Sequence, residues 1–583
     1  MALLPRMNNE YGESLVTDVF AGYNHNAKIG DGEFYSTTNL TSALCPLLAN
    51  RKKRGRVRTM AQPGGLLARE KLAFVDGGTL FYDGAPTPLT GLRAGEKQLV
   101  SMGAYIVVFP DKVYYNTADP DDYGSTEASY SSAGAVEFSL CRADGEEYRE
   151  PVLSGTAPNA PEDGALWIDT GAETHILRQW SAAMNEWSAV PTVCTRLRFI
   201  SEGELPALFC SGDGVTISGA AAENVNGEKV IRSVGGGDGT RDYLVVTGLL
   251  EQALTQTEGT VRVERRTPEP DFVIECRNRL WGCRYGSVDG ENVNEIFCSA
   301  LGDFRNWRQF MGLSTDSWTA SVGSDGPWTG AVNYLGCPLF FKENRIHRVS
   351  VSAVGAHQIS ETVCRGVQEG CAKSLQVVNE TLLYKSRADV CAYQGGFPAG
   401  VSEALGEESY SQAAAGVLGE RYYISMRAAD GTWHLFVYDL RRGIWMREDS
   451  LHAAAFASCG DELYCVADGA LLALAGTVGT PEPFVAWEAE TGMLGYQYPD
   501  RKYVSRYRLR LFMEEGAQLD VYLMYDSSGE WVRQGRIRRR GTGTVTLPIR
   551  PRRCDHLRIR LVGRGEVRLY SIAKILTMGG DAG

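Results

Sequence analysis

Three tryptophans that lie close together in the sequence could bind a sugar. Trp167, Trp180 and Trp187 fall within Ala160–Thr192, a stretch whose pattern is typical of a compact β-hairpin unit. Aromatic side chains present flat apolar faces on which pyranose rings can stack. The other interpretation is that the three rings form the core of this unit, because about 40 residues have little else to bury. We expect the core role and keep sugar binding as the alternative.

Paired carboxylates could support glycoside hydrolysis, which requires two such groups about 5–10 Å apart. The candidates are Asp121, Asp122, Asp303 and Glu369. Sequence spacing does not fix the distance between carboxylates in space, and a β-rich chain of this size offers many such pairs. The sequence contains no G-x-S-x-G, H-E-x-x-H or P-loop motif. We therefore assign no catalytic residue and expect no enzymatic activity.

The sequence also contains no recognisable metal-binding or cofactor-binding motif. The 14 cysteines and seven histidines are dispersed, and no Cys-x-x-Cys pair occurs. Cysteine-based zinc sites need such close spacing. The sequence therefore predicts free, buried thiols in a reducing compartment, with no metal-binding residue, no cofactor-binding residue and no cofactor.

Two basic runs, Arg51–Arg58 and Arg536–Arg540, could contact phosphates. The whole chain, however, has 59 Lys and Arg against 71 Asp and Glu, a net charge of −12. This balance argues against a protein whose main activity is to grip nucleic acid. We expect both runs to be solvated loops, or patches that meet an acidic neighbouring subunit, and we place the second at a hairpin tip.

Short strands and tight turns must position these residues. Glycine accounts for 66 of the 583 residues, and helical periodicity is almost absent. A turn followed by an alternating aromatic and aliphatic strand recurs along the chain, and such units usually stack radially as propeller blades. An array of β-sandwiches is the alternative. The units are Gly77–Gly84, Pro110–Asn116, Arg277–Cys283, Lys342–Val351, Asn379–Ser386, Thr432–Leu440 and Asp461–Leu474.

The predicted fold is all-β, a β-propeller with an inserted small β domain and a C-terminal antiparallel β-sandwich. Residues 1–118 form an N-terminal segment and the first blade or blades, and 119–269 form the inserted domain. Residues 270–479 supply the remaining blades. Residues 480–583 form the sandwich, because strict alternation of apolar and charged residues indicates a sheet with one face in water.

Targeting signals are not apparent in the sequence. No stretch approaches the roughly 18 apolar residues that a membrane-spanning helix needs. The first residues, MALLPRMNNEYGES, lack the apolar core of a secretory signal. We expect a protein that is made in, and kept or assembled in, a cytoplasm.

Four stretches carry characteristic motifs: Val19–Met60, with Gly32, Glu33, Asn39, Leu40 and Gly55; Asp271–Phe310, with Asn278–Trp281, Ser299, Gly302–Phe304, Asn306 and Trp307; Tyr384–Leu405; and Leu547–Ile572. The first three resemble the β-propeller virion proteins of tailed bacteriophages, including the tail nozzle or tubular proteins of short-tailed phages, and the fourth is similar to the β-sandwiches that end phage structural proteins of Firmicutes prophages. Their order along the chain is the stronger part of the resemblance, while the range 119–269 has no counterpart in that family. We expect Trp281, Phe304 and Trp307 to matter for folding.

The resemblance implies a structural component of a phage or prophage tail. It suggests a homo-oligomeric ring, a hexamer in nozzle proteins, that retains and conducts genomic DNA during ejection. The implied partners are other tail or head–tail connector proteins and double-stranded DNA, which passes without sequence-specific binding. Carboxylates along such a channel would repel phosphates. The implied location is the virion, after assembly in the host bacterial cytoplasm. The alternative is a tail-tip protein that binds a receptor or glycan, and a glycan-degrading propeller enzyme is the third class.

Overall fold

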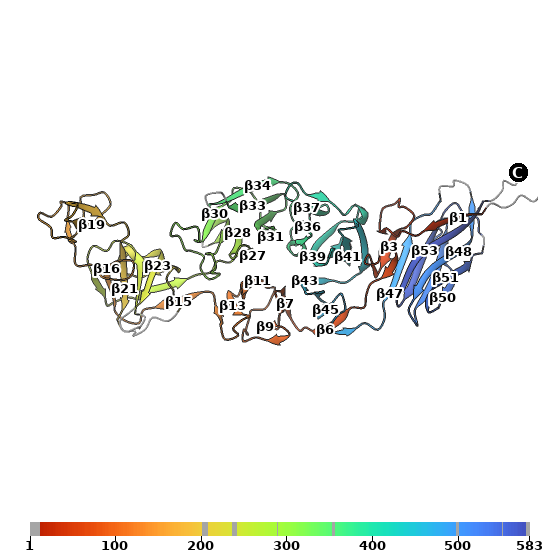
Figure 1. Cartoon of the computed structure of the whole chain (residues 1–583), viewed down its shortest axis with the longest axis horizontal. Helices are drawn as coiled ribbons and strands as arrows, with labels where there is room; N and C mark the ends of the chain where they lie inside the picture. The colour runs from red at the N-terminus through yellow and green to blue at the C-terminus, as the bar shows by residue number, and fades with distance from the viewer. Residues whose placement is uncertain are drawn as a thin grey trace, which may run out of the picture.

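Strands joined by tight turns make up nearly all of the computed structural model, which describes residues 12–200, 208–235, 242–288, 290–351, 356–496, 501–550 and 552–578. A propeller lies in the middle of the molecule, an inserted domain at one end and a sandwich at the other (Figure 1). Glycines allow the tight turns: Gly77 and Gly78, for example, have positive φ angles of 58° and 78° between two consecutive strands.

Seven antiparallel blades make up the propeller in the described part of the chain. Their strands, blade by blade, are β7 (Pro63–Ala68), β8 (Leu72–Asp76), β9 (Thr79–Tyr82) and β10 (Ala85–Pro86); β11 (Gln98–Met102), β12 (Tyr105–Phe109), β13 (Val113–Asn116) and β14 (Tyr123–Ser125); β27 (Phe272–Glu275), β28 (Leu280–Val288), β29 (Glu291–Cys298) and β30 (Trp318–Ser321); β31 (Gly330–Tyr334), β32 (Cys337–Lys342), β33 (Arg345–Val351) and β34 (His357–Val363); β35 (Gln376–Val378), β36 (Thr381–Lys385), β37 (Val390–Tyr393) and β38 (Ala399–Gly400); β39 (Tyr410–Leu418), β40 (Arg421–Ala428), β41 (Trp433–Asp439) and β42 (Ile444–Asp449); and β43 (Ala453–Cys459), β44 (Glu462–Ala467) and β45 (Ala470–Ala473) with β6 (Gly55–Thr59) and β46 (Thr480–Pro481).

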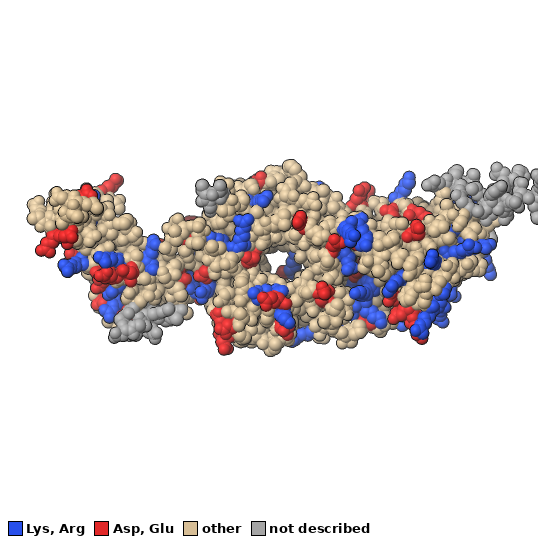
Figure 2. Space-filling model, in the orientation of Figure 1, with Lys and Arg blue, Asp and Glu red and all other residues tan. Residues whose placement is uncertain are grey.

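The ring of blades is closed by a strand from early in the chain. β6 pairs with β45 and so completes the last blade. The first strand of each blade is innermost, with the short helix η3 (Ala372–Ser374) between β31 and β35, and β43 contacts β7. These inner strands surround an opening through the propeller (Figure 2), which Lys373 and Glu96 border with an ion pair of 3.0 Å. Trp281, Phe304 and Trp307 are buried, as expected.

The sandwich consists of two facing sheets. Buried and exposed residues alternate along β48, where Tyr507, Leu509 and Leu511 are buried and Arg506, Arg508 and Arg510 are exposed. One sheet contains β1 (Gly12–Thr17), β4 (Leu40–Thr41), β5 (Leu48–Asn50), β48 (Lys502–Met513), β51 (Gly541–Pro548) and β53 (Val567–Met578), and the other contains β3 (Glu33–Thr38), β47 (Ala486–Thr491), β49 (Gln518–Tyr525), β50 (Val532–Ile537) and β52 (Leu557–Arg564).

One hydrogen-bonded sheet joins the sandwich to the propeller. The two-residue strand β2 (Gly22–Tyr23) pairs with β3 of the sandwich and, through Tyr23, with Trp445 of β42. Gly22 has a φ of +90°, and a Cβ there would meet the carbonyl oxygen of Trp445. Ten strands from β39 to β50 therefore form a single sheet.

Buried ion pairs reinforce this joint and correct one expectation. Arg54 donates to Glu448 at 2.7 Å and to Asp449 at 2.6 Å, and Arg51 donates to Glu482 at 2.8 Å. The prediction that this basic run is a solvated loop is wrong for Arg51 and Arg54, whose side chains are 8% and 5% exposed. The run passes from the sandwich into the last blade, where carboxylates from distant parts of the chain surround it.

The inserted domain begins at β15 and ends at β26, which pair with each other. Asn306 of the propeller holds it through two hydrogen bonds, one accepted from the Gly214 amide (3.0 Å) and one donated to the Gly212 carbonyl (2.7 Å). Its strands are β15 (Ala128–Ser131), β16 (Val136–Cys141), β17 (Val152–Ser154), β18 (Leu166–Asp169), β19 (Ile176–Ser181), β20 (Glu186–Ala189), β21 (Cys194–Phe199), β22 (Gly214–Ser218), β23 (Gly227–Gly235), β24 (Tyr243–Thr247), β25 (Leu254–Gln256) and β26 (Arg262–Arg265), with the short helix η1 (Glu223–Val225).

The modules are nested. The inserted domain interrupts the propeller, and the propeller lies between β5 and β47 of the sandwich, whose first strand, β1, pairs with its last, β53. The predicted fold class, an all-β propeller with an inserted β domain and a C-terminal sandwich, is confirmed. The four domain ranges stay a prediction, and the sheets add that the N-terminal strands β1 and β3–β5 belong to the sandwich.

Candidate functional site

A small four-stranded sheet, β17–β18–β19–β20, lies at the end of the inserted domain farthest from the propeller (Figure 1). Its two faces differ in what they contact. Leu166, Ile168 and Leu177 are buried in the domain core with Phe138 and Leu197. This aliphatic face attaches the sheet to the rest of the inserted domain.

The opposite face carries the three tryptophans. Trp180 and Trp187 are cross-strand partners, and so are Trp167 and Arg178. Side chains alternate along a strand, so these four residues lie on the face that does not pack on the core. We call them the tryptophan face.

The rings of the tryptophan face pack on one another. The Trp187 ring centroid lies 5.4 Å from that of Trp167 and 5.5 Å from that of Trp180. Trp167 is buried, and its Nε1 donates to the Ser154 carbonyl at 2.9 Å. The Arg178 guanidinium lies 5.8 Å from the Trp167 ring centroid. Trp180 and Trp187 are only half-buried, so they leave ring surface exposed.

A depression of about 350 Å³ lies beside Trp180 and is lined in part by Asp163, Gln179, Ser181 and Ser188. Gln179, Ser181 and Ser188 alternate with Trp180 and Trp187 along their strands and so belong to the opposite face, which leaves Arg178 as the polar side chain of the tryptophan face itself. An apolar platform with a few hydrogen-bonding groups nearby can contact both the C–H face and the hydroxyls of a sugar. The prediction that the three tryptophans form the core of this unit holds for Trp167, which is buried, but not for Trp180 and Trp187, which stay half-buried while Leu166, Ile168 and Leu177 fill the domain core from the other face.

Two of the candidate carboxylates come together, at the outer edge of a blade. Arg305 forms an ion pair with Asp303 (3.4 Å), and its positive charge also lowers the pKa of Asp122. Asp122 accepts hydrogen bonds from Asn116 and Tyr114, each at 3.0 Å. Asp121 and Glu369 are exposed, and Glu369 lies in another blade, beside Glu343. Sequence reasoning did not find Arg305, which lies far from Asp122 in the chain.

Asp122 is held as a carboxylate. The amide of Asn116, and after it the hydroxyls of Tyr114 and Tyr105, lower its pKa against the opposing effect of burial. Its contribution to stability is therefore present above the unfolded pKa of about 4 and is lost as the pH falls through the folded value. We expect Asp122→Asn to lower the melting temperature most near neutral pH, with a difference from wild type that shrinks below about pH 4. Asp121→Asn is the control, and a pH-independent difference for Asp122→Asn would contradict the assignment.

The prediction that the second basic run lies at a hairpin tip is wrong. The run spans the end of β50 and the connection to β51, and these two strands pair with different partners in opposite sheets of the sandwich. Arg536 donates to Asp520 at 2.8 Å, Arg538 donates to Gln518, and Arg540 pairs with Glu515 at 3.1 Å. All three arginines are exposed. The run is therefore a solvated, partly paired surface of the sandwich.

The cysteines are free thiols, and ten of the 14 are buried. Burial raises the pKa of Cys141 and of Cys391 to about 12, which keeps them protonated. In the described ranges, no group of three His, Cys, Asp or Glu residues is placed to hold a metal ion. The same ranges contain no helix long and apolar enough to cross a membrane.

No protein-family model matches the chain, and no curated protein is similar to it at the level of sequence. Among solved structures it is similar to the phage phi92 endosialidase, with 10% identity, a TM-score of 0.22, and coverage of 81% of this chain and 70% of that one. It is also similar to Trypanosoma rangeli sialidase, with 8% identity, a TM-score of 0.21, and coverage of 99% and 96%. At these TM-scores the likeness carries no argument about function.

One expectation is nevertheless corrected by this comparison. The sequence predicted no enzymatic activity, whereas the similar structures are those of sialidases and an endosialidase, which are enzymes. We withdraw that exclusion. The similarity assigns no reaction to this chain.

Proposed function

We propose that the chain is a glycan-binding, receptor-recognition protein of a tailed-phage or prophage particle. The observation that carries this proposal is the tryptophan face, which points away from the core at the end of the molecule opposite the sandwich. The phage setting rests on the motif resemblance, and the binding function rests on the geometry of this face.

Aromatic surface that stays exposed to water forgoes the free energy of burial. Large apolar side chains gain most when they are buried, and the aliphatic face of the small sheet already supplies the core contacts. Two half-buried indoles on the other face therefore retain apolar surface that a ligand can cover. A sugar ring covers such a surface with its C–H face while its hydroxyls reach the Arg178 side chain on the same face.

The net charge of the inserted domain indicates which glycans it would bind. The range 119–269 contains 11 Lys and Arg against 25 Asp and Glu, a net of −14. A surrounding field of this sign repels polyanions. We therefore expect neutral or amino-sugar polymers to bind better than acidic ones. Several copies on one particle would raise the avidity of a weak individual contact.

The test uses the full chain with three immobilised probes: N-acetylglucosamine oligomers, a neutral glucose polymer and polygalacturonate. We expect retention on at least one of the first two and at least tenfold weaker retention for Trp180→Ala and Trp187→Ala, which is about 1.4 kcal/mol. Trp433→Ala, a half-buried propeller tryptophan stacked on His452, is the matched control. If Trp180→Ala and Trp187→Ala are retained as strongly as wild type, and their circular dichroism spectra are unchanged, the proposal is refuted. Reducing-end release in the same samples would reveal hydrolysis.

The ring of copies, its hexameric number and its role in conducting DNA stay predictions from the resemblance. Native mass spectrometry of the purified chain, followed by negative-stain imaging, tests them. Six copies in a closed ring whose lumen is about 20 Å or more, wide enough for duplex DNA, would support a conduit. A trimer would contradict it.

A further inference from the structure

A second cavity lies in the propeller, between the blade of β27–β30 and the blade of β31–β34. Its volume is about 220 Å³, below the 300–1,000 Å³ that is usual for drug-sized ligands. The cavity therefore admits a group of about one ring. Apolar side chains form most of its wall: Cys276, Trp281, Leu301, Cys337, Pro338, Val349 and Val351.

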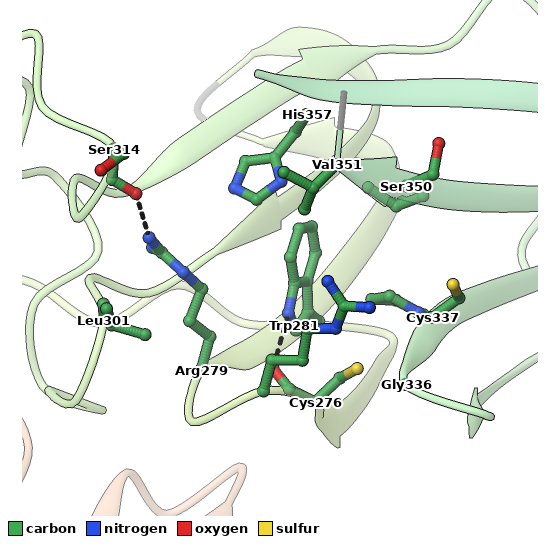
Figure 3. A pocket seen from close by; sticks show the side chains of 13 residues that line it. Cys276, Arg279, Trp281, Leu301, Ser314, Gly336, Cys337, Ser350, Val351 and His357 are labelled. Carbon is green, nitrogen blue, oxygen red and sulfur yellow. Dashed lines mark hydrogen bonds between the residues drawn. The ribbon is translucent and has the colours of Figure 1, made fainter. Parts of the chain in front are cut away.

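An aromatic cluster forms one side of this cavity. Trp281 and His357 meet edge to face, with ring centroids 5.1 Å apart (Figure 3), and Trp318 lies 5.4 Å from the same histidine. The Trp281 Nε1 already donates to the Cys276 carbonyl at 3.2 Å, so the indole offers the cavity only apolar ring surface. His357 Nδ1 is buried and has no hydrogen-bond partner among the described residues.

Two arginines line the same cavity without an acidic partner. Arg279 is 4% exposed and donates to the carbonyls of Ser299 (2.8 Å), Asp316 (2.6 Å) and Ser314 (2.7 Å), the last of which is drawn in Figure 3. Arg277 is exposed. Neither forms an ion pair within the described ranges, and no Asp or Glu lines the cavity.

Two acidic residues adjoin these arginines, Glu275 two positions before Arg277 and Asp316 through its carbonyl, and both carboxylates already accept hydrogen bonds from backbone amides. The Asp316 carboxylate accepts from the amides of Met311 and Leu313, and Glu275 accepts from the Asn278 amide at 2.8 Å. Burial is the main cause that lowers the pKa of His357, and the positive charges of Arg279 and Arg277 lower it further. A neutral imidazole and two unneutralised cations therefore face one apolar cavity.

We propose that this cavity binds a small apolar group that carries one carboxylate. A buried charge is costly without a counter-charge. A carboxylate would supply that counter-charge to the buried Arg279 and would also attract the exposed Arg277 at the edge of the cavity. The His357 Nδ1–H tautomer can donate to the same ligand. The apolar wall covers a single aromatic or branched aliphatic group. The chemistry is shared by a free aromatic acid and by the C-terminal residue of a peptide. This inference is independent of the tryptophan face.

The experiment is titration calorimetry on the full chain with four probes. N-Acetyl-L-phenylalanine represents a peptide end, its amide is the uncharged match, benzoate is a free aromatic acid, and acetate has the charge without the ring. We expect at least one ring-bearing acid to bind at least tenfold more tightly than both the amide and acetate, a difference of about 1.4 kcal/mol. Tighter binding of the N-acetyl amino acid assigns a peptide end, and tighter binding of benzoate assigns a free acid.

Two variants test the location, and both change partly or fully exposed residues. Arg277→Gln removes the outer charge and Val351→Trp fills the cavity, so each is expected to weaken binding at least tenfold. Arg387→Gln, at an arginine whose side chain is 77% exposed in another blade, is expected to leave it unchanged. The proposal is overturned if no acid binds at about 10 mM, if acid and amide bind equally, or if both cavity variants bind like wild type.

Discussion

Replacing Arg54 with alanine is expected to lower the free energy of unfolding by about 3–5 kcal/mol, the usual cost of removing one member of a buried ion pair. The Arg54 guanidinium donates to Glu448 and Asp449 at 2.7 and 2.6 Å. The side chains of Arg54 and Glu448 are both 5% exposed. The variant therefore leaves the Glu448 carboxylate inside the joint between propeller and sandwich, where Arg51, at 3.9 Å, is the one remaining ion-pair partner among the described residues.

Urea unfolding followed by tryptophan fluorescence measures this loss. Arg56→Ala, two residues away in the same run and exposed, should stay within about 0.5 kcal/mol of wild type. Arg54→Lys keeps the charge but loses the forked geometry, so an intermediate value is expected. A loss of less than about 1 kcal/mol for Arg54→Ala would show that the buried pairs do not hold the joint.

Trp445→Ala is the second large effect, with an expected loss of about 3–5 kcal/mol, as for other large aromatic side chains removed from a core. Trp445 is 1% exposed, and its Nε1 donates to the Val401 carbonyl at 2.7 Å. Its ring lies 4.8 Å from that of Tyr438, and its backbone pairs with Tyr23 of the strand that leads to the sandwich. The truncation creates a cavity where the blade meets the sandwich.

The matched control is Phe397→Ala, which shortens an aromatic side chain that is 78% exposed in the neighbouring blade. It should change stability by no more than about 0.5 kcal/mol. Trp445→Phe, which loses the hydrogen bond but keeps much of the volume, should fall between Trp445→Ala and wild type. Equal denaturation midpoints for Trp445→Ala and Phe397→Ala would contradict the assignment of Trp445 to the joint.

Local patterns predicted the strands well, because alternation along a strand is a property of neighbouring residues. The series from Tyr507 to Met513 is buried at every second position, as its sequence indicates. The recurring turn-and-strand units likewise became blades. Arg54, in contrast, meets Glu448, which is 394 residues away. No local pattern records such a partner, so the basic run was assigned to solvent.

Local sequence patterns also failed to predict which tryptophans of the candidate site are exposed, for a different reason. In the segment Leu166–Trp167–Ile168 both faces of the strand are apolar, so alternation cannot tell which face turns inward. The small size of the unit suggested that all three tryptophans form its core, but only Trp167 is buried, and Trp180 and Trp187 stay half-buried. The propeller cavity was beyond sequence reasoning, since His357 is an isolated histidine whose contacts with Trp281 and Trp318 depend on how two blades meet.

The nested order of the modules has a consequence for how this protein can change over generations. The first and last strands of the inserted domain pair directly, Ala128 opposite Arg265, so its two ends leave the propeller side by side. A foreign domain with adjacent ends can be grafted between them at little cost in loop closure. Recombination within this range would thus replace the tryptophan face while the blades and the sandwich keep their own contacts. The inserted domain can therefore diverge without altering the packing of the other two modules.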